Sequence, residues 1–204
     1  MIDLYTAPTP NGRKPAIALE EMGLPYTIHT IDLSQKEQFS PEFVTLNPNS
    51  KIPVITDADT GLTIFESGAI LIYLAEKTGM LWPSDRAQRM DALQWLMFQM
   101  GSVGPMLGQL GHFRHSAPEP VPYGITRYEA ETLRLFGVLD RQLSHRDYVA
   151  GDYSIADIAL YPWIAISNHL QVSIEAYPHL TRWVNTLAAR PAVQAGITRV
   201  NQKT

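Results

Sequence analysis

The sequence predicts a small α/β domain followed by an all-helical domain. Strand-like apolar runs, some of them alternating at period two, lie within the first 78 residues. From residue 87 onward the apolar residues recur at helical spacing instead. A connector rich in structure-breaking residues separates the two patterns. We therefore expect one domain over 1–79 and a second over 86–204.

The first domain is expected to follow the order β-α-β and then β-β-α, which makes a small α/β sandwich. The expected strands are 2–5, 26–32, 53–57 and 62–65. Between the last two, the residues Ala58-Asp59-Thr60-Gly61 favour a hairpin turn. The expected helices are 13–21 and 67–77, with a short segment around 42–44 between them. Pro15 is expected in the first turn of the first helix, where a missing N–H is tolerated.

The second domain is expected to contain helices alone. The predicted helices are 87–110, 123–143, 154–169, 178–190 and 191–200. The third begins with Ser154-Ile155-Ala156-Asp157, a capping-box variant with aspartate in place of glutamate or glutamine. Its expected role is structural.

Composition and charge exclude several classes of function. The net charge of −4 argues against a nucleic-acid-binding surface. The absence of cysteine from all 204 residues excludes disulfides, thiolate metal sites and a cysteine nucleophile. No basic stretch followed by a long apolar run opens the chain, and no segment approaches about 20 uninterrupted apolar residues. We expect a cytoplasmic protein with no metal, membrane or nucleic-acid partner.

The turn Ala7-Pro8-Thr9-Pro10-Asn11-Gly12 leads from the first strand into the first helix. Such a junction aims backbone N–H groups and the positive end of a helix dipole at one point, which suits an anion. The turn offers the hydroxyl of Thr9 and the amide of Asn11, but no cysteine, serine or tyrosine nucleophile. The pattern indicates a site whose ligand brings its own reactive atom.

Two further stretches carry candidate binding residues. A cis bond between Ile52 and Pro53 would turn the backbone of Ile52 outward, toward an extended peptide ligand; the alternative is a proline that simply opens a strand. Ser67 stands at a helix N-terminus, where it could be only a cap. Glu66 beside it could merely compensate the helix dipole, or it could hold a ligand ammonium while Ser67 holds an adjacent carboxylate.

These motifs together resemble the cytosolic glutathione S-transferase superfamily. The resemblance rests on Thr9-Pro10-Asn11, Lys51-Ile52-Pro53, Phe65-Glu66-Ser67-Gly68-Ala69-Ile70 and Ser154-Ile155-Ala156-Asp157, and it covers nearly the whole chain. It implies a thioredoxin-like domain followed by an all-helical domain. The bacterial Nu class is most similar, through Thr9-Pro10-Asn11-Gly12, Gly104-Pro105-Met106-Leu107-Gly108-Gln109, His112-Phe113 and Pro122-Tyr123.

The resemblance implies that the chain binds glutathione, either reduced or as glutathione disulfide. The γ-glutamyl end would lie against Glu66 and Ser67, and the cysteinyl backbone would pair with Ile52 beside cis-Pro53. Lys51 and Gln38 would contact the glycyl or γ-glutamyl carboxylates, although Gln38 could equally be solvated.

The resemblance also implies a catalytic pair, Thr9 and Asn11, whose hydrogen bonds would favour the thiolate of glutathione over the thiol. Arg127 would reach the ligand of a neighbouring subunit in a homodimer; the alternative is a surface arginine paired with Glu131. Met106 is a candidate lining residue of a second-substrate pocket.

Three functions fit these residues. The first is a glutathione-dependent thiol–disulfide oxidoreductase, or disulfide-bond reductase, acting on a small thiol or disulfide substrate. The second is a conventional transferase or peroxidase, in which the thiolate attacks an electrophile or a hydroperoxide. The third is a non-catalytic glutathione-binding module, against which the intact set of site residues argues.

Overall fold

A four-stranded mixed sheet forms the first part of the computed structural model, which describes residues 1–202. Its strands are β1 (Ile2–Thr6), β2 (Tyr26–Thr30), β3 (Val54–Asp57) and β4 (Leu62–Phe65). They stand in the order β2-β1-β3-β4, with β1 parallel to β2 and β3 antiparallel to both β1 and β4. The predicted succession of elements and the β3–β4 hairpin are confirmed.

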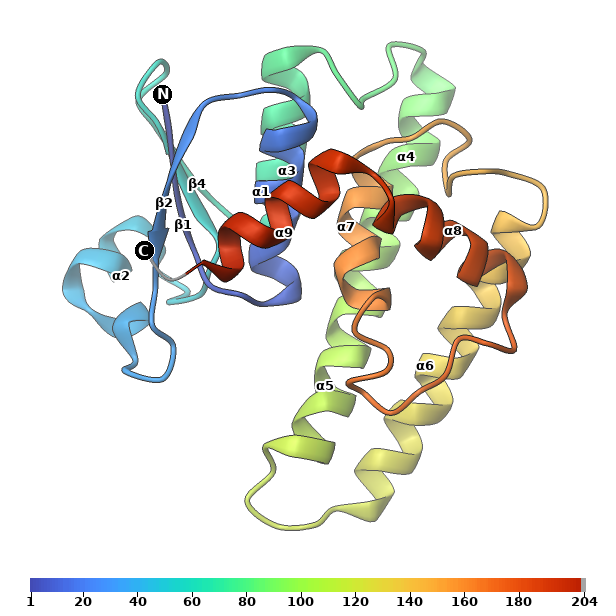
Figure 1. Cartoon of the computed structure of the whole chain (residues 1–204). Helices are drawn as coiled ribbons and strands as arrows, with labels where there is room; N and C mark the ends of the chain where they lie inside the picture. Colours follow the sequence, from blue (N-terminus) through green and yellow to red (C-terminus); the bar gives the residue numbers. More distant parts are fainter. Residues whose placement is uncertain (203–204) are drawn as a thin grey trace. The chain divides into compact units, whose positions relative to one another are not determined.

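Helices lie on both faces of this sheet (Figure 1). α1 (Pro10–Glu21) and α3 (Ser67–Thr78) share one face and contact each other. The short helix α2 (Pro41–Leu46) lies on the other side, after the 3-10 turn η1 (Glu37–Phe39). These are the layers expected of a thioredoxin-like domain.

The helix α1 begins three residues earlier than the sequence predicted. The Thr9 hydroxyl oxygen accepts a hydrogen bond from the Gly12 N–H at 3.1 Å and so caps the helix, and Pro10 takes the first helical position, which needs no N–H donor. The expectation that Pro15 stands in the first turn is therefore wrong, because Pro15 lies inside the helix. As a result, Asn11 belongs to the first turn of α1 rather than to the preceding loop.

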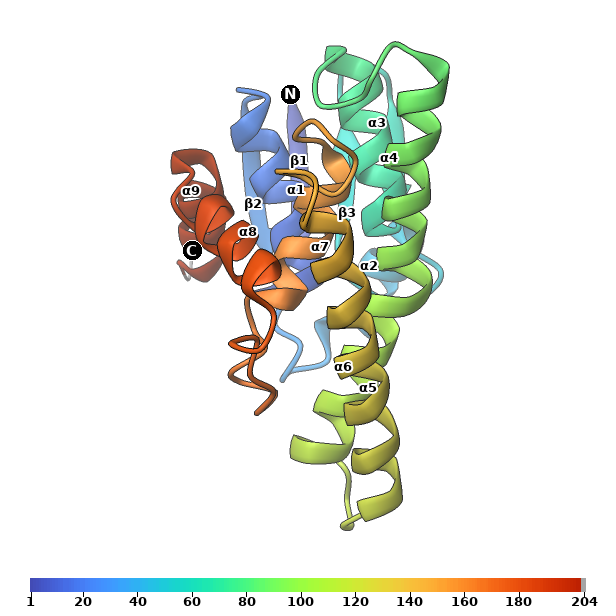
Figure 2. The ribbon, with the colours of Figure 1, turned by 90° about the vertical axis from the view of Figure 1, so that its right-hand side faces the viewer.

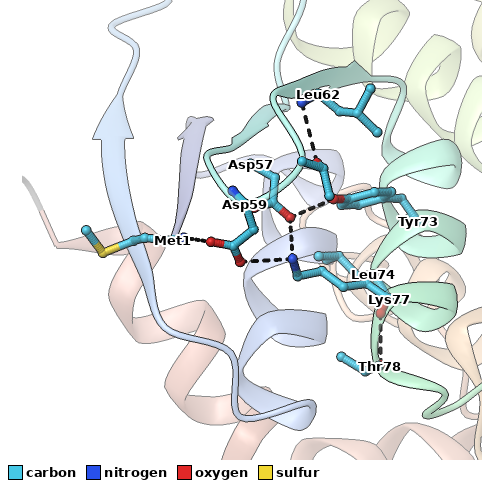
Figure 3. Close-up of polar contacts among 9 residues, drawn as sticks. Met1, Asp57, Asp59, Leu62, Tyr73, Leu74, Lys77 and Thr78 are labelled. Carbon is cyan, nitrogen blue, oxygen red and sulfur yellow. Dashed lines mark hydrogen bonds and ion pairs between the residues drawn. The ribbon is translucent and has the colours of Figure 1, made fainter.

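The far end of α3 is tied to the β3–β4 hairpin by a polar cluster (Figure 3). The fully buried side chain of Asp57 accepts hydrogen bonds from Lys77 at 2.7 Å and from the Tyr73 hydroxyl at 2.6 Å. Burial alone would raise the pKa of Asp57, but these two bonds and a backbone N–H lower it to about 2. Lys77 also reaches Asp59 at 3.1 Å. The cluster fixes the C-terminal half of α3 and thereby the position of its N-terminus.

The C-terminal helix α9 (Pro191–Asn201) packs along α1. Gly196 permits this contact, because a Cβ atom there would lie only 2.7 Å from the backbone nitrogen of Ile17. Two ion pairs border the contact: Arg190 to Glu21 at 2.7 Å, and Arg199 to Glu20 at 2.9 Å. The last helix of the chain thus covers the first.

The remaining helices are α4 (Arg86–Phe98), α5 (Gly104–His115), α6 (Pro122–Leu143), α7 (Ile155–Ile164) and α8 (Pro178–Ala188). Figure 2 shows α5 and α6 side by side. The single helix predicted over 87–110 is wrong, because a π-helical turn, η2 (Gln99–Val103), interrupts it. Pro105 has no N–H to donate to the preceding turn, and Gly104 leaves room for the buried Gln99 side chain.

The capping box of α7 is confirmed. The Ser154 hydroxyl oxygen accepts from the Ala156 N–H, while Asp157 accepts from the Ser154 N–H at 3.1 Å. The same buried carboxylate also accepts from the Val149 N–H at 3.1 Å and from the Trp183 indole N–H at 2.9 Å. Burial raises the pKa of Asp157 to about 6 in spite of these bonds. One side chain therefore joins the start of α7, the preceding loop and α8.

By packing, the chain forms two compact units. The first contains residues 1–82 together with the residues from Ala188 onward, and the second contains Pro83–Leu187. The domain limits 1–79 and 86–204 stay a prediction drawn from sequence order. None of the helices within residues 1–202 combines the length and apolar character needed to cross a membrane.

Candidate functional site

Three loops that carry predicted site residues meet at one edge of the sheet. In the sheet register, Val54 at the start of β3 lies opposite Tyr5 near the end of β1 and Phe65 at the end of β4. The residues that follow β1, precede β3 and follow β4 therefore emerge at the same edge. The register brings together segments 7–11, 51–53 and 66–67, which the sequence places far apart.

The first segment presents Thr9 and Asn11 on the first turn of α1. The Thr9 oxygen accepts the Gly12 N–H, which leaves the hydroxyl hydrogen available for a ligand. Gly12 has to be glycine, because a Cβ atom would lie 2.1 Å from the Ala7 carbonyl oxygen. Thr6 below the turn donates its hydroxyl hydrogen to the Gly12 carbonyl at 3.0 Å. Two hydrogen bonds to Gly12, one at its N–H group and one at its carbonyl oxygen, therefore fix the conformation of the turn.

The third segment opens α3. Glu66 is exposed and has a φ of 69°, an unusual value for a residue other than glycine, whereas Ser67 is only 3% exposed. The Glu66 carbonyl accepts the Ile70 N–H at 2.9 Å, and the Glu66 side chain makes no cap hydrogen bond to the helix. Residues with such backbone conformations cluster at active sites and ligand-binding positions. The conformation leaves the first turn of α3 facing the sheet edge.

The middle segment contains the cis bond between Ile52 and Pro53, as predicted. Lys51 before it is exposed and Ile52 is half-buried. Asn47, which the sequence analysis missed, anchors this segment: its buried amide donates to the Lys51 carbonyl at 2.6 Å and accepts from the Asn49 N–H at 2.9 Å. The only sequence signal for this role is an asparagine before a turn.

Gln38 lies in η1, which follows β2 at the same edge of the sheet. Its amide oxygen is buried and has no hydrogen-bond partner among residues 1–202. Gln38 as a whole is half-buried, so its amide oxygen is shielded from solvent although the residue is not. A buried polar atom without a partner is costly, which makes Gln38 a candidate contact for a bound ligand.

Lys14 is the second residue that the sequence analysis missed. It is fully buried in α1, and its Nζ atom donates to the Ser67 hydroxyl oxygen at 3.1 Å. Burial lowers the pKa of Lys14 to about 7, and the charge of Glu66 opposes this effect. The pattern of apolar residues in the helix gave no reason to expect a lysine inside. The lysine connects the second turn of α1 to the first turn of α3.

A cavity of about 540 Å³ opens beside Thr9. The loops after β1 and β2 and the end of α9 line it, and Asp32 and Glu37 contribute carboxylates to its wall. This volume falls within the range of small-molecule sites. A ligand group held at Thr9 therefore has room for a second group next to it.

Arg127 lies on α6, in the second compact unit. Glu131 forms its close ion pair with Arg134, at 2.7 Å, and the charge of Arg127 acts on Glu131 only from a longer distance. Together with Met106, Arg127 lines a cavity of about 480 Å³. Its guanidinium is exposed and open to a partner.

Both parts of the chain match family models. Residues 1–76 match the glutathione S-transferase N-terminal domain, and residues 125–191 match the glutathione S-transferase C-terminal domain. Two Escherichia coli (strain K12) proteins, the disulfide-bond oxidoreductases YfcG and YghU, are 48% and 40% identical to it. The alignment with YfcG covers 94% of this chain and 92% of the relative, and that with YghU covers 96% and 73%.

Comparison with solved structures leads to the same family as the family models. A glutathione transferase from Burkholderia graminis, with two glutathione molecules bound per subunit, superposes with a TM-score of 0.94 at 47% identity, covering 99% of this chain and 89% of that one. One from Pseudomonas putida, with one glutathione disulfide bound per subunit, gives a TM-score of 0.93 at 46% identity, covering 96% and 90%. The fold class and the family resemblance predicted from the sequence are confirmed: the chain belongs to the glutathione S-transferase family.

Proposed function

We propose that this chain is a glutathione-dependent disulfide-bond reductase whose active site is the sheet edge formed by segments 7–11, 51–53 and 66–67. The observation that carries the proposal is the meeting of two helix N-termini at this edge, in a chain without a single cysteine. Two of its relatives bear the name disulfide-bond oxidoreductase, and structural neighbours hold glutathione or its disulfide. The residues present fit this tripeptide.

The γ-glutamyl end of glutathione is a zwitterion, and the start of α3 offers a partner for each charge. Glu66 is exposed and accepts the ammonium group, while Ser67 and the first N–H groups of α3 receive the carboxylate. Ile52 lies two residues before the start of β3, and its backbone pairs with the cysteinyl residue of the ligand in this proposal. The ammonium of Lys51 and the amide N–H group of Gln38 donate to the remaining carboxylate.

The thiol of glutathione lies at the first turn of α1 in this arrangement. Thr9 donates its free hydroxyl hydrogen, and Asn11 donates from its amide, to the sulfur. One charge-assisted hydrogen bond is worth about 1.5–3 kcal/mol, which lowers a thiol pKa by roughly one to two units. Thr9 and Asn11 thus favour the thiolate near neutral pH.

Bound glutathione supplies the thiolate that attacks one sulfur of a disulfide. The attack forms a mixed disulfide and releases one substrate thiolate, which takes up a proton. A second glutathione thiolate then attacks the glutathione sulfur, giving glutathione disulfide and the second substrate thiol. The cavity beside Thr9 has room for the group that leaves or for the second glutathione.

The family relationship also supports a homodimer, in which the exposed Arg127 reaches the ligand of the neighbouring subunit. A guanidinium suits the carboxylates of glutathione because it binds them in a bidentate manner. A reductase of this kind works in the cytoplasm, where the glutathione pool is reducing.

Asn11→Ala is expected to raise the pKa of the bound glutathione thiol by about one unit, because one hydrogen bond to the thiolate is lost. Ultraviolet absorbance of the thiolate, titrated against pH with glutathione bound, measures this directly. Asn168→Ala removes an exposed amide from the helical unit and should leave the titration unchanged. An unchanged titration in Asn11→Ala would exclude the role assigned to Asn11.

Turnover on two substrates tests the reaction itself. We expect purified protein with glutathione to reduce 2-hydroxyethyl disulfide faster than it conjugates a chloronitrobenzene. The reverse preference would indicate conventional transferase chemistry, which uses the same thiolate on an electrophilic carbon. Glutathione binding without turnover on either substrate would indicate a non-catalytic glutathione-binding module.

A further inference from the structure

A buried lysine stands directly behind the serine that receives the ligand carboxylate. Lys14 is fully buried, and its Nζ atom lies 3.1 Å from the hydroxyl oxygen of Ser67, which is itself only 3% exposed. Lysine is almost never fully buried without a partner that requires it. Since Lys14 comes from α1 and Ser67 opens α3, this contact joins the two helix N-termini of the site.

The charge on Lys14 responds to its surroundings. Burial lowers its pKa to about 7, and the nearby charge of Glu66 raises it in part. The elements packed against α1 carry other charged groups. Lys77 of α3 pairs with Asp57, Arg190 before α9 with Glu21, Arg199 of α9 with Glu20, and Asp3 of β1 with His29, whereas Glu76 of α3 is exposed to solvent. Both the neutral and the charged form of Lys14 are therefore populated near neutral pH.

An anion at the start of α3 changes the ratio of the charged to the neutral form of Lys14. A carboxylate bound by Ser67 stands within a few ångströms of Lys14 and favours the charged ammonium. An ammonium can only donate, so the Ser67 oxygen accepts from it and the serine hydrogen points elsewhere. A neutral amine can instead accept that hydrogen and withdraw it from the ligand.

We propose that Lys14 is a positioning residue for glutathione: its ammonium orients the Ser67 hydroxyl toward the γ-glutamyl carboxylate. Above neutral pH, binding of each ligand is therefore accompanied by the uptake of one proton from solvent at Lys14. This inference rests on the proposed function, because it takes the γ-glutamyl carboxylate as the ligand of Ser67. Glutathione affinity should accordingly fall as pH rises through the pKa of Lys14 in the free protein.

The test uses isothermal titration calorimetry with S-methylglutathione, which has no thiol proton of its own to release. Repeating the titration in buffers of different ionisation enthalpy counts the protons taken up. We expect about tenfold weaker binding at pH 8 than at pH 6, and uptake approaching one proton at pH 8 but little at pH 6. Absence of proton uptake by the wild-type protein at pH 8 would overturn the proposal.

Lys14→Met keeps the length and apolar stem of the side chain and removes the charge. It should bind S-methylglutathione about tenfold more weakly than the wild type at pH 6, with little pH dependence and without proton uptake. Lys36→Met, at an exposed lysine, should retain the wild-type behaviour. Proton uptake that persists in Lys14→Met would assign the proton to another group and contradict the inference.

The experiment distinguishes failure of the proposed function from failure of the role assigned to Lys14. If the wild-type protein does not bind S-methylglutathione at any pH, the proposed function fails as well. Binding that is independent of pH and of Lys14 would contradict only the role of the lysine. If Lys14→Met does not fold, as thermal denaturation would show, absence of proton uptake by the wild-type protein would still overturn the proposal.

Discussion

Asp157→Ala should cost about 4 kcal/mol of unfolding free energy, a very large loss for a single substitution. The fully buried carboxylate accepts from the N–H groups of Val149 and Ser154 and from the Trp183 indole. Alanine leaves these three buried donors unsatisfied, at about 1–3 kcal/mol each, and it also removes half of the capping box. Equilibrium urea unfolding would measure the loss.

The pH dependence of this loss tests its cause. Because the pKa of Asp157 is raised to about 6, the native state binds a proton more tightly than the unfolded state, and wild-type stability declines as pH rises from about 4 to 6. The alanine variant lacks this decline, so the difference between the two proteins should be about 1 kcal/mol larger at pH 5 than at pH 7. Asp147→Ala removes an exposed partner of Arg182 and should change stability little. Equal losses in the two variants would contradict this assignment.

Gly12→Ala should lower kcat/KM for disulfide reduction by about 100-fold and stability by about 3 kcal/mol. The added Cβ atom would lie 2.1 Å from the Ala7 carbonyl oxygen and 2.5 Å from the Thr6 hydroxyl, so the backbone of the turn has to move. That movement displaces Thr9, which accepts the Gly12 N–H, from the position in which we propose that it contacts the sulfur. Steady-state kinetics and urea unfolding measure the two effects.

Gly101→Ala is the matched control for this variant. A Cβ atom at Gly101 meets no other atom within 4 Å, so activity and stability should stay near the wild-type values. Wild-type activity in Gly12→Ala would show that the turn tolerates displacement, and it would remove the argument that Thr9 is held in place by this close contact.

Local patterns in the sequence were sufficient to predict much of the fold. The capping box at Ser154 and Asp157 is specified by residues within one helical turn, and the β3–β4 hairpin by turn formers between two apolar runs. The cis bond before Pro53 came from the family resemblance as well as from the position of the proline. The capping box and the hairpin therefore depend on residues that are neighbours in the chain.

The errors arose where distant residues decide the structure. The π-helical turn η2 depends on the Gln99 side chain packing against Gly104, and periodicity alone reads the segment as one helix. The burial of Lys14 depends on Ser67, 53 positions away, because a charged residue in a helix is expected to face solvent. The role of Asn47 likewise depends on a loop conformation that no pattern encodes.

The contact between α9 and α1 has a consequence for biosynthesis. The sheet-bearing unit is discontinuous in sequence: residues 1–82 are synthesised before the helical unit, whereas α9, which packs along α1, is synthesised after it. The whole helical unit is translated in between, and domains fold as units during synthesis. The surface of α1 that α9 covers therefore stays uncovered until the residues of α9 have been synthesised.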